Sequence, residues 1–246
     1  MKLGRAGVSL PDKTGRKQGR ARLARGLLYM SYGLAFRPLR KGGANNRANR
    51  VSHYLTRRQV EDIIAAADYA EAMGWGFSRH WSVHLERAGI PDSMGAPFVT
   101  RLLDRARRHL KRRGVELVAI WVRENSPESG SYVHILLHLS KSVNLRNLTR
   151  KWIVAAGGSY RRRVSKMRTI GGRLGVEGAD PAHYWANADA VLSYVLKGCS
   201  EETGKTLGLR LMGRGGEVVG KRAGCSQVIG PDARRMADFA HGIEGC

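Results

Sequence analysis

Two short segments carry the side chains of this chain that are best suited to chemistry. Residues 132–138 read Tyr-Val-His-Ile-Leu-Leu-His and predict a buried strand that carries His134. Residues 194–197 read Tyr-Val-Leu-Lys and predict a helical turn on which Tyr194 and Lys197 are neighbours. A lysine beside a tyrosine favours the phenolate and neutralises charge on an attacked phosphate. With a formal net charge of +23, the pair of segments predicts DNA cleavage by a tyrosine, with a metal holding the phosphate.

The metal would sit beside the strand that bears His134. Side chains two apart on a strand share a face, so Tyr132, His134 and His138 point the same way. His134 and His138 are about 13 Å apart along a strand, too far to share one ion. The other ligands must then come from neighbouring strands, where Glu124 and His84 are the candidates. The alternative is that His134 is an ordinary half-buried strand histidine and Glu124 a solvated carboxylate.

The predicted helix at residues 181–197 has two distinct faces. At 100° per residue, Tyr194 and Lys197 fall away from the apolar stripe, so Tyr194 is not placed to fill the core. Lys197 also has a structural explanation, because a cation in the last turn complements the helix dipole and Gly198 suits the C′ position. The apolar stripe comprises Trp185, Ala188, Leu192, Val195 and Leu196.

The charge excess predicts a polyanionic partner. The chain has 43 Lys and Arg against 20 Asp and Glu, and each neutralised phosphate releases a condensed counterion. The alternative is a soluble protein that is merely basic. One basic run lies beside Tyr160 and Trp152, which suits backbone neutralisation combined with base stacking, although such a run can also be a solvated face. Its members are Arg161, Arg162, Arg163, Lys166 and Arg168.

Cysteine usage and apolar content indicate the compartment. Cys199, Cys225 and Cys246 show no Cys-x-x-Cys spacing and predict free thiols in a reducing environment. The apolar stretch at residues 27–36 is too short to span a bilayer and has no cleavage site. We therefore expect a cytoplasmic protein without a membrane partner.

The chain predicts a basic, partly flexible N-terminal arm at residues 1–50 and one folded domain at 51–240 with a basic C-terminal segment. Patterning predicts helices that begin at Thr56 and span 97–113, 144–156 and 181–197. It predicts strands at 75–86, 115–124, 131–139, 207–212 and 217–221, with irregular chain at 160–172. This order favours an α+β fold with an antiparallel sheet, a split β-α-β core, and helices on one or both faces.

The two segments resemble motifs of the HUH endonuclease superfamily, specifically the small rolling-circle replication initiators of bacterial plasmids and filamentous phages. That family has His-hydrophobic-His on a central strand of a ferredoxin-like or RRM-like core, and Tyr-x-x-Lys on a later helix. Residues 130–139 and 191–198 occupy these positions in the same order. Residues 220–226, followed by Arg234 and Arg235, resemble the tail of bacterial members, which adds Lys221 and Arg222 to the expected DNA-binding residues. The likeness spans roughly residues 75–235.

The resemblance implies a mechanism. A Mg²⁺ or Mn²⁺ ion bound by His134 and its neighbours polarises the scissile phosphate of single-stranded origin DNA. Tyr194 attacks it, leaving a 5′-phosphotyrosine link and a free 3′-OH that primes replication, while Lys197 positions the tyrosine or the phosphate. Tyr184 and Tyr160 are not one turn from Tyr194, which favours a single nucleophile.

This chain departs from the family at Tyr132, which stands where the first motif histidine is expected. A phenol is a poorer ligand than an imidazole, so Tyr132 weakens the site unless Glu124 compensates. Two other functions stay open. A relaxase or single-tyrosine transposase uses the same chemistry, and a non-catalytic nucleic-acid-binding protein could retain the fold with a decayed metal site. No Gly-x-x-x-x-Gly-Lys-Ser/Thr loop is present, so unwinding would need a host helicase.

Overall fold

The computed structural model describes residues 49–140, 143, 145, 147–171, 181–209 and 215–243. The predicted arm at residues 1–50 therefore lies almost wholly outside the described residues, as do Cys246 and the end of the predicted strand at 207–212. In the described part, Cys199 and Cys225 are free thiols. No helix among these residues is long and apolar enough to cross a membrane.

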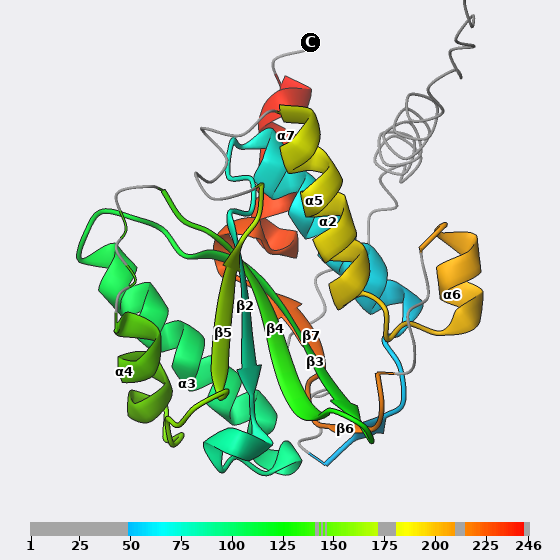
Figure 1. Cartoon of the computed structure of the whole chain (residues 1–246). Coiled ribbons are helices and arrows are strands. Elements are labelled where there is room, and N and C mark those ends of the chain that lie inside the picture. Colours follow the sequence, from blue (N-terminus) through cyan, green and yellow to red (C-terminus); the bar gives the residue numbers. More distant parts are fainter. Residues whose placement is uncertain are drawn as a thin grey trace, which may run out of the picture. The chain divides into compact units, whose positions relative to one another are not determined.

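The centre of the fold is a five-stranded sheet in the order β5-β2-β4-β3-β7 (Figure 1). Every neighbouring pair in it is antiparallel. A second, two-stranded antiparallel sheet pairs β1 with β6. This arrangement confirms the prediction of an α+β protein with an antiparallel sheet. The strands are β1 (Val51–Ser52), β2 (Arg79–His84), β3 (Val118–Ser126), β4 (Gly130–His138), β5 (Ser165–Thr169), β6 (Val218–Val219) and β7 (Ala223–Cys225).

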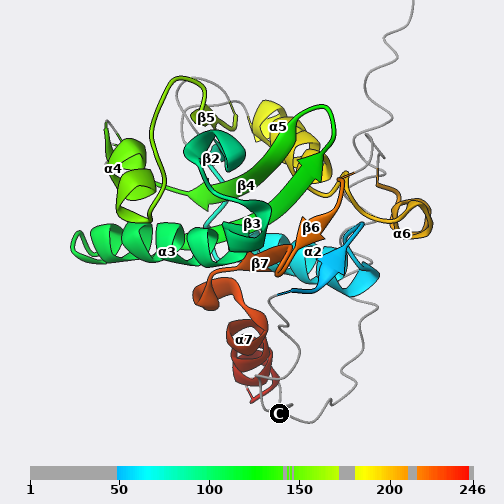
Figure 2. The same ribbon diagram turned by 90° about the horizontal axis from the view of Figure 1, so that it is seen from below.

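Helices cover both faces of the large sheet, as Figures 1 and 2 show from two directions. One face packs on α3 and α4 through a core that includes Trp81, Ile135 and Phe98. The other packs on α2 and α5 through a core that includes Ile120, Leu136 and Leu192. The helices are α2 (Arg57–Ala72), α3 (Asp92–Lys111), α4 (Leu148–Ala155), α5 (Pro181–Val195), α6 (Glu201–Thr206) and α7 (Pro231–Ile243), with short 3₁₀ turns η1 (Glu86–Ala88) and η3 (Gln227–Ile229).

Local signals place some element ends correctly and others wrongly. The Thr56 hydroxyl accepts from the Gln59 amide and the Gln59 side chain accepts from the Thr56 amide, which confirms the predicted capping box of α2. Helix α3 begins at Asp92, earlier than predicted, and contains Pro97 in its second turn. Residues 207–208 form a turn instead of a strand. The basic stretch 160–172, which the sequence predicts to be irregular, contains strand β5. This strand forms because β2 supplies its hydrogen-bonding partners.

A buried ion pair holds α3 to the sheet. The Arg123 side chain is fully buried and donates to the Asp92 carboxylate at 2.6 Å and to the backbone carbonyls of Val219 and Lys221. Asp92 also accepts from the Val219 amide at 2.6 Å and from Ser131 at 2.9 Å. The guanidinium thus ties the start of α3, strand β3 and the β6 segment together.

Removing this cation is expected to destabilise the fold strongly. Arg123→Leu leaves the Asp92 carboxylate without its countercharge and removes the guanidinium donor to the backbone carbonyls of Asp92, Val219 and Lys221. We therefore predict a loss of about 3–5 kcal/mol in the free energy of unfolding. Urea denaturation measures it. The matched control is Arg107→Leu, which breaks a surface pair with Asp104 and should cost less than about 1 kcal/mol. Equal losses in the two variants would contradict a structural role for the Arg123 clamp.

Candidate active site

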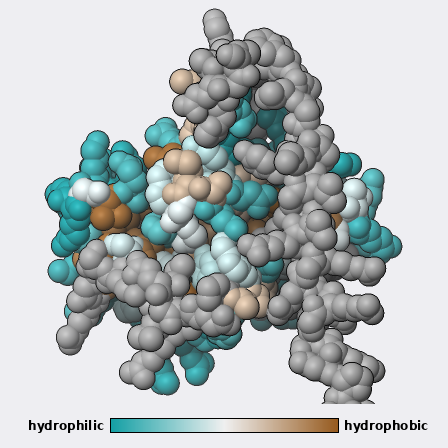
Figure 3. All heavy atoms as spheres, turned by 90° about the horizontal axis from the view of Figure 1, so that it is seen from above, coloured by the Kyte–Doolittle hydropathy of each residue, from teal (hydrophilic) through white to brown (hydrophobic). Residues whose placement is uncertain are grey.

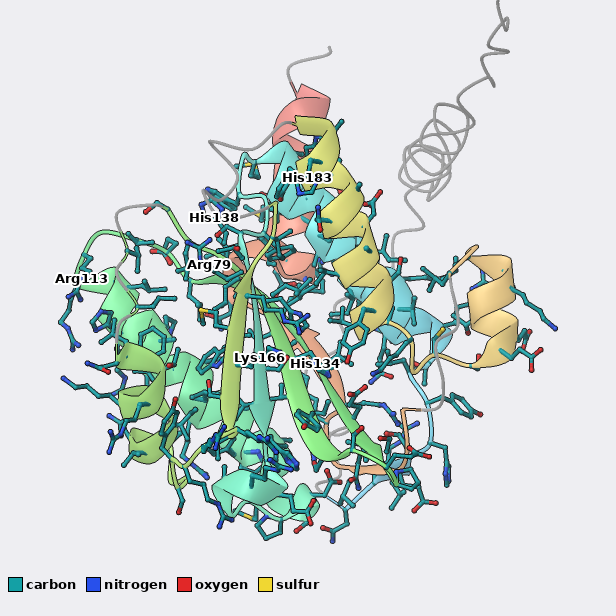
Figure 4. The ribbon with its side chains drawn as sticks, in the orientation of Figure 1. Arg79, Arg113, His134, His138, Lys166 and His183 are labelled. Carbon is teal, nitrogen blue, oxygen red and sulfur yellow. The ribbon has the colours of Figure 1, made fainter. Side chains whose placement is uncertain are left out.

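Strand register gathers polar side chains on the sheet face that α5 covers only in part. In one row across the sheet, Lys166 of β5 pairs with Ser82 of β2, which pairs with His134 of β4. Two residues along β2 in one direction, His80 pairs with Arg168 of β5. Two residues along β2 in the other direction, His84 pairs with Tyr132 of β4, which pairs with Glu124 of β3. These residues share one face because each lies an even number of positions from its neighbour along a strand. Figure 4 shows His134 and Lys166 at mid-sheet, with His138 further along.

His134 is the centre of this group. Its Nδ1 lies 3.2 Å from His80 Nε2 and 3.0 Å from the Ser82 hydroxyl, while Ser82 Oγ is 3.3 Å from His80 Nε2. The side chain of His134 is 5% exposed, and burial of this kind requires both ring nitrogens to have partners. The two imidazoles and the hydroxyl form a compact triangle of nitrogen and oxygen atoms on adjacent strands.

Glu124 binds the opposite nitrogen of His134. Its Oε1 lies 2.8 Å from His134 Nε2, and its Oε2 lies 2.9 Å from Lys197 Nζ. The carboxylate therefore connects the histidine on β4 with the lysine at the end of α5. A carboxylate on the far nitrogen of a histidine orients the ring and selects the tautomer whose other nitrogen is free to accept or ligate.

Tyr194 faces the same histidines from α5. Its ring centroid is 5.3 Å from that of His134 and 5.9 Å from that of His80. Lys197 Nζ is 4.1 Å from the centroid of the Tyr194 ring. The apolar side of the helix is turned inward, where Leu192 and Val195 are buried, so the predicted separation of the two helix faces is observed. Tyr184 is buried instead and donates to the Phe77 carbonyl, and burial raises its pKa to about 12.

The electrostatics of the group follow from burial and charge. Burial and the neighbouring His134 lower the pKa of His80 to about 4, so its imidazole is neutral at pH 7. Burial alone would raise the pKa of Glu124, but its bonds to His134 and Lys197 outweigh this and hold the pKa at about 2. Burial opposes the charge on Lys197, yet Glu124 and Tyr194 raise its pKa above the ordinary value. The group therefore presents a neutral imidazole, a carboxylate and an ammonium.

These residues line one cavity of about 1050 Å³. It brings together the predicted residues Tyr194, Lys197, His134, Glu124 and Tyr132, and three of the predicted basic residues. The basic members from the predicted set are Arg163, Lys166 and Arg168, and the cavity adds Arg87, which sequence reasoning did not single out. Seen from above, the described surface is mostly hydrophilic with small apolar areas (Figure 3).

Four of the predicted DNA-binding residues lie elsewhere. Arg161 donates to the Arg87 carbonyl at 2.9 Å, and neither it nor Arg162 lines the cavity. Lys221 lies over the Trp121 ring and borders a separate hollow of about 390 Å³. The prediction that Arg222 binds DNA is wrong. Its side chain donates to the Ser52 carbonyl, and the residue is only 1% exposed, so it cannot contact DNA. Burial lowers the pKa of Arg222 to about 10.

The structure places His80, a residue that sequence reasoning missed, beside His134, and places the predicted candidate His84 elsewhere. His84 packs on Tyr132 with ring centroids 4.2 Å apart, whereas His80 approaches His134. Both histidines share the open face of β2, so alternation alone could not choose between them. The register sets Ser82 opposite His134 and leaves His80 and His84 at the two diagonal positions, of which His80 reaches His134. His138 bonds the Gly76 carbonyl, which agrees with its predicted separation from the His134 site.

The chemistry of the donor set fits a divalent ion held by two imidazoles. Ligands about 2.1 Å from one ion lie roughly 3 Å from each other, and His80 Nε2 and His134 Nδ1 are 3.2 Å apart. In the described part of the chain, no three His, Cys, Asp or Glu side chains are already arranged around one point. Glu124 bonds His134 Nε2, the ring nitrogen opposite Nδ1. The Tyr132 ring lies parallel to the His134 ring, with the ring centroids 5.9 Å apart. Further ligands would therefore come from water and substrate phosphate, as is common for such ions.

No protein-family model matches this chain, and searches of curated proteins and of solved structures found no significant match.

Proposed function

We propose that this protein nicks and rejoins single-stranded DNA through Tyr194, as a rolling-circle replication initiator does. The observation that supports this most directly is the approach of Tyr194 to His134 inside a basic cavity, with ring centroids 5.3 Å apart. The strand order also supports the proposal, because β4 lies between β2 and β3 and α3 links those two strands, as it would in a split β-α-β core.

Each residue of the group has a role in the proposed reaction. The Tyr194 hydroxyl gives up its proton to water and its oxygen attacks the phosphorus. A new P–O bond forms, the bond to the 3′ oxygen breaks, and that oxygen takes up a proton from water. The Lys197 ammonium stabilises the phenolate and the charge that develops on the phosphate. His80 and His134 would hold the divalent ion, which supplies Lewis-acid polarisation of the phosphate when bound. Glu124 positions both His134 and Lys197.

Reversal of the same step rejoins the strand, because the phosphotyrosine link keeps the energy of the broken phosphodiester. The proposed partner is single-stranded origin DNA. A separate helicase would supply unwinding.

The test uses single-stranded oligonucleotides tiled across the DNA element that encodes the chain, labelled and incubated with Mn²⁺. Denaturing electrophoresis should show a protein–DNA adduct on one or a few tiles. If salt-sensitive binding occurs on the same tiles without any adduct under several divalent ions, the non-catalytic nucleic-acid-binding function is favoured instead.

The donor set predicts a metal preference. Imidazole nitrogens suit first-row transition ions, whereas Mg²⁺ prefers oxygen ligands and sheds its water reluctantly. We expect Mn²⁺ to support adduct formation at a concentration at least about tenfold lower than Mg²⁺. Titration of each ion into metal-free protein, with adduct yield as the readout, measures this. Equal requirements for the two ions would argue against ligation by His80 and His134.

A further inference from the structure

We propose that Tyr132 is part of a second phosphate subsite, which holds the DNA phosphate next to the scissile one. This inference rests on the proposed function in that the cavity must accept a single strand. It assigns Tyr132, Arg87 and Arg163 to backbone binding, and it removes Tyr132 from the set of metal ligands.

Three elements that are distant in sequence converge at this end of the cavity. Tyr132 lies near the start of β4, Arg87 lies in η1 just after β2, and Arg163 lies just before β5. Arg161 ties the third element to the second by donating to the Arg87 carbonyl, and the His84 amide donates to the Val164 carbonyl at 2.8 Å. The β3–β4 turn adds Ser129 to the lining. The end of the cavity is thus a built surface rather than one flexible loop.

The cations here are available to a ligand. Within the described residues, Arg87, Arg163 and Lys166 form no ion pair through their side chains, although all three line the cavity. Among the residues that the structure describes, the carboxylates on the lining are Glu124, which is already paired with Lys197, and Asp189 on α5. An unneutralised group of cations in a concave surface attracts a polyanion and gains from releasing its counterions.

Arg163 adds an independent observation. Its φ is +68°, a backbone conformation that residues other than glycine and asparagine rarely adopt. Arg163 also follows two arginines that do not line the cavity. Strained backbone of this kind concentrates at ligand-binding positions, where the surrounding structure holds it in place.

Tyr132 is suited to a phosphate and not to the ion. Its ring is held between His84, at 4.2 Å, and His134, at 5.9 Å and nearly parallel. Among the residues that the structure describes, its hydroxyl has no hydrogen-bond partner. Two residues along a strand separate Tyr132 from His134 by about 7 Å, which is comparable with the distance between successive phosphates of an extended strand. A phenol O–H beside arginines is a good donor to a phosphate oxygen.

The test is equilibrium binding of a fluorescent dT12 strand in EDTA, where no cleavage can occur. Arg163→Gly removes the cation and also relieves the positive φ, so we expect an unchanged or higher melting temperature with dT12 binding weakened about tenfold. The slope of log K against log salt should fall by about one. The matched control is the neighbouring Arg162→Gln, which should bind nearly as wild type.

A second variant separates phosphate from base contacts. Tyr132→Phe should weaken dT12 binding about three- to tenfold, and the same loss should appear on an abasic strand that keeps the phosphates, with Tyr54→Phe as the exposed control. Wild-type binding by Arg163→Gly and Tyr132→Phe would overturn the subsite. So would a Tyr132 effect that vanishes on the abasic strand. These results are independent of adduct formation, so the subsite can fail while nicking stands, and the reverse.

Discussion

Tyr194→Phe is expected to abolish the covalent protein–DNA adduct, lowering its rate of formation by roughly a thousandfold or more. The substitution removes only the nucleophilic oxygen. The ring remains, and with it the contacts to Lys197 Nζ at 4.1 Å and to the His134 ring at 5.3 Å. We therefore expect an unchanged melting temperature and dT12 affinity within about twofold of wild type. Denaturing electrophoresis and fluorescence anisotropy measure the two quantities.

Tyr54→Phe is the control for this variant, because Tyr54 is exposed and does not line the cavity. It should form the adduct at the wild-type rate. An adduct that persists in Tyr194→Phe would show that another residue attacks the phosphate. Mass spectrometry of the trapped peptide would then identify that residue, and the assignment of α5 as the nucleophile helix would be wrong.

His80→Ala is expected to weaken Mn²⁺ binding by at least about tenfold and to abolish nicking. The variant removes one of two imidazole nitrogens that lie 3.2 Å apart. Calorimetry with Mn²⁺ alone measures the affinity without reference to activity. Binding of dT12 in EDTA should be retained, since His80 is neutral at pH 7 and contributes no charge to backbone neutralisation.

The other two histidines of the same strand faces, His138 and His84, provide the control variants for His80→Ala. His138→Gln should leave both Mn²⁺ affinity and nicking near wild type, because His138 bonds the Gly76 carbonyl. His84→Ala should leave Mn²⁺ affinity unchanged, because His84 packs on Tyr132. If His84→Ala abolishes Mn²⁺ binding and His80→Ala does not, the ion lies at the other end of the strand and the proposed ligand pair is wrong.

Periodic patterns in the sequence predicted the faces of individual elements. The 3.6-residue period separated Tyr194 and Lys197 from Leu192 and Val195, and the structure has the first pair on the cavity and the second in the core. The period of two placed Tyr132 and His134 on one strand face. The Thr56 capping box predicted where α2 begins. Each of these depends on residues within a few positions of each other.

Relations between elements could not be predicted in this way. The choice of His80 over His84 could not come from strand pairing alone, because Ser82 pairs with His134 and both histidines lie two residues from Ser82. The side-chain contacts decide it: His84 packs on Tyr132 and His80 approaches His134. In the sequence, Arg222 cannot be distinguished from the other basic residues. In the structure it is buried, because its segment packs against the β1 region and its side chain donates to the Ser52 carbonyl. The contact of Glu124 with both His134 and Lys197 joins β3, β4 and the end of α5.

Local chemistry in the sequence thus specified which side chains each strand and helix presents, because backbone geometry repeats over two or 3.6 residues. Which of those side chains meet was set by strand register and by helix packing across the sheet. Both depend on contacts between segments far apart in the chain, and no local pattern encodes them. For this protein, the tyrosine and lysine could be read from one helix, whereas their histidine and carboxylate partners required the folded sheet.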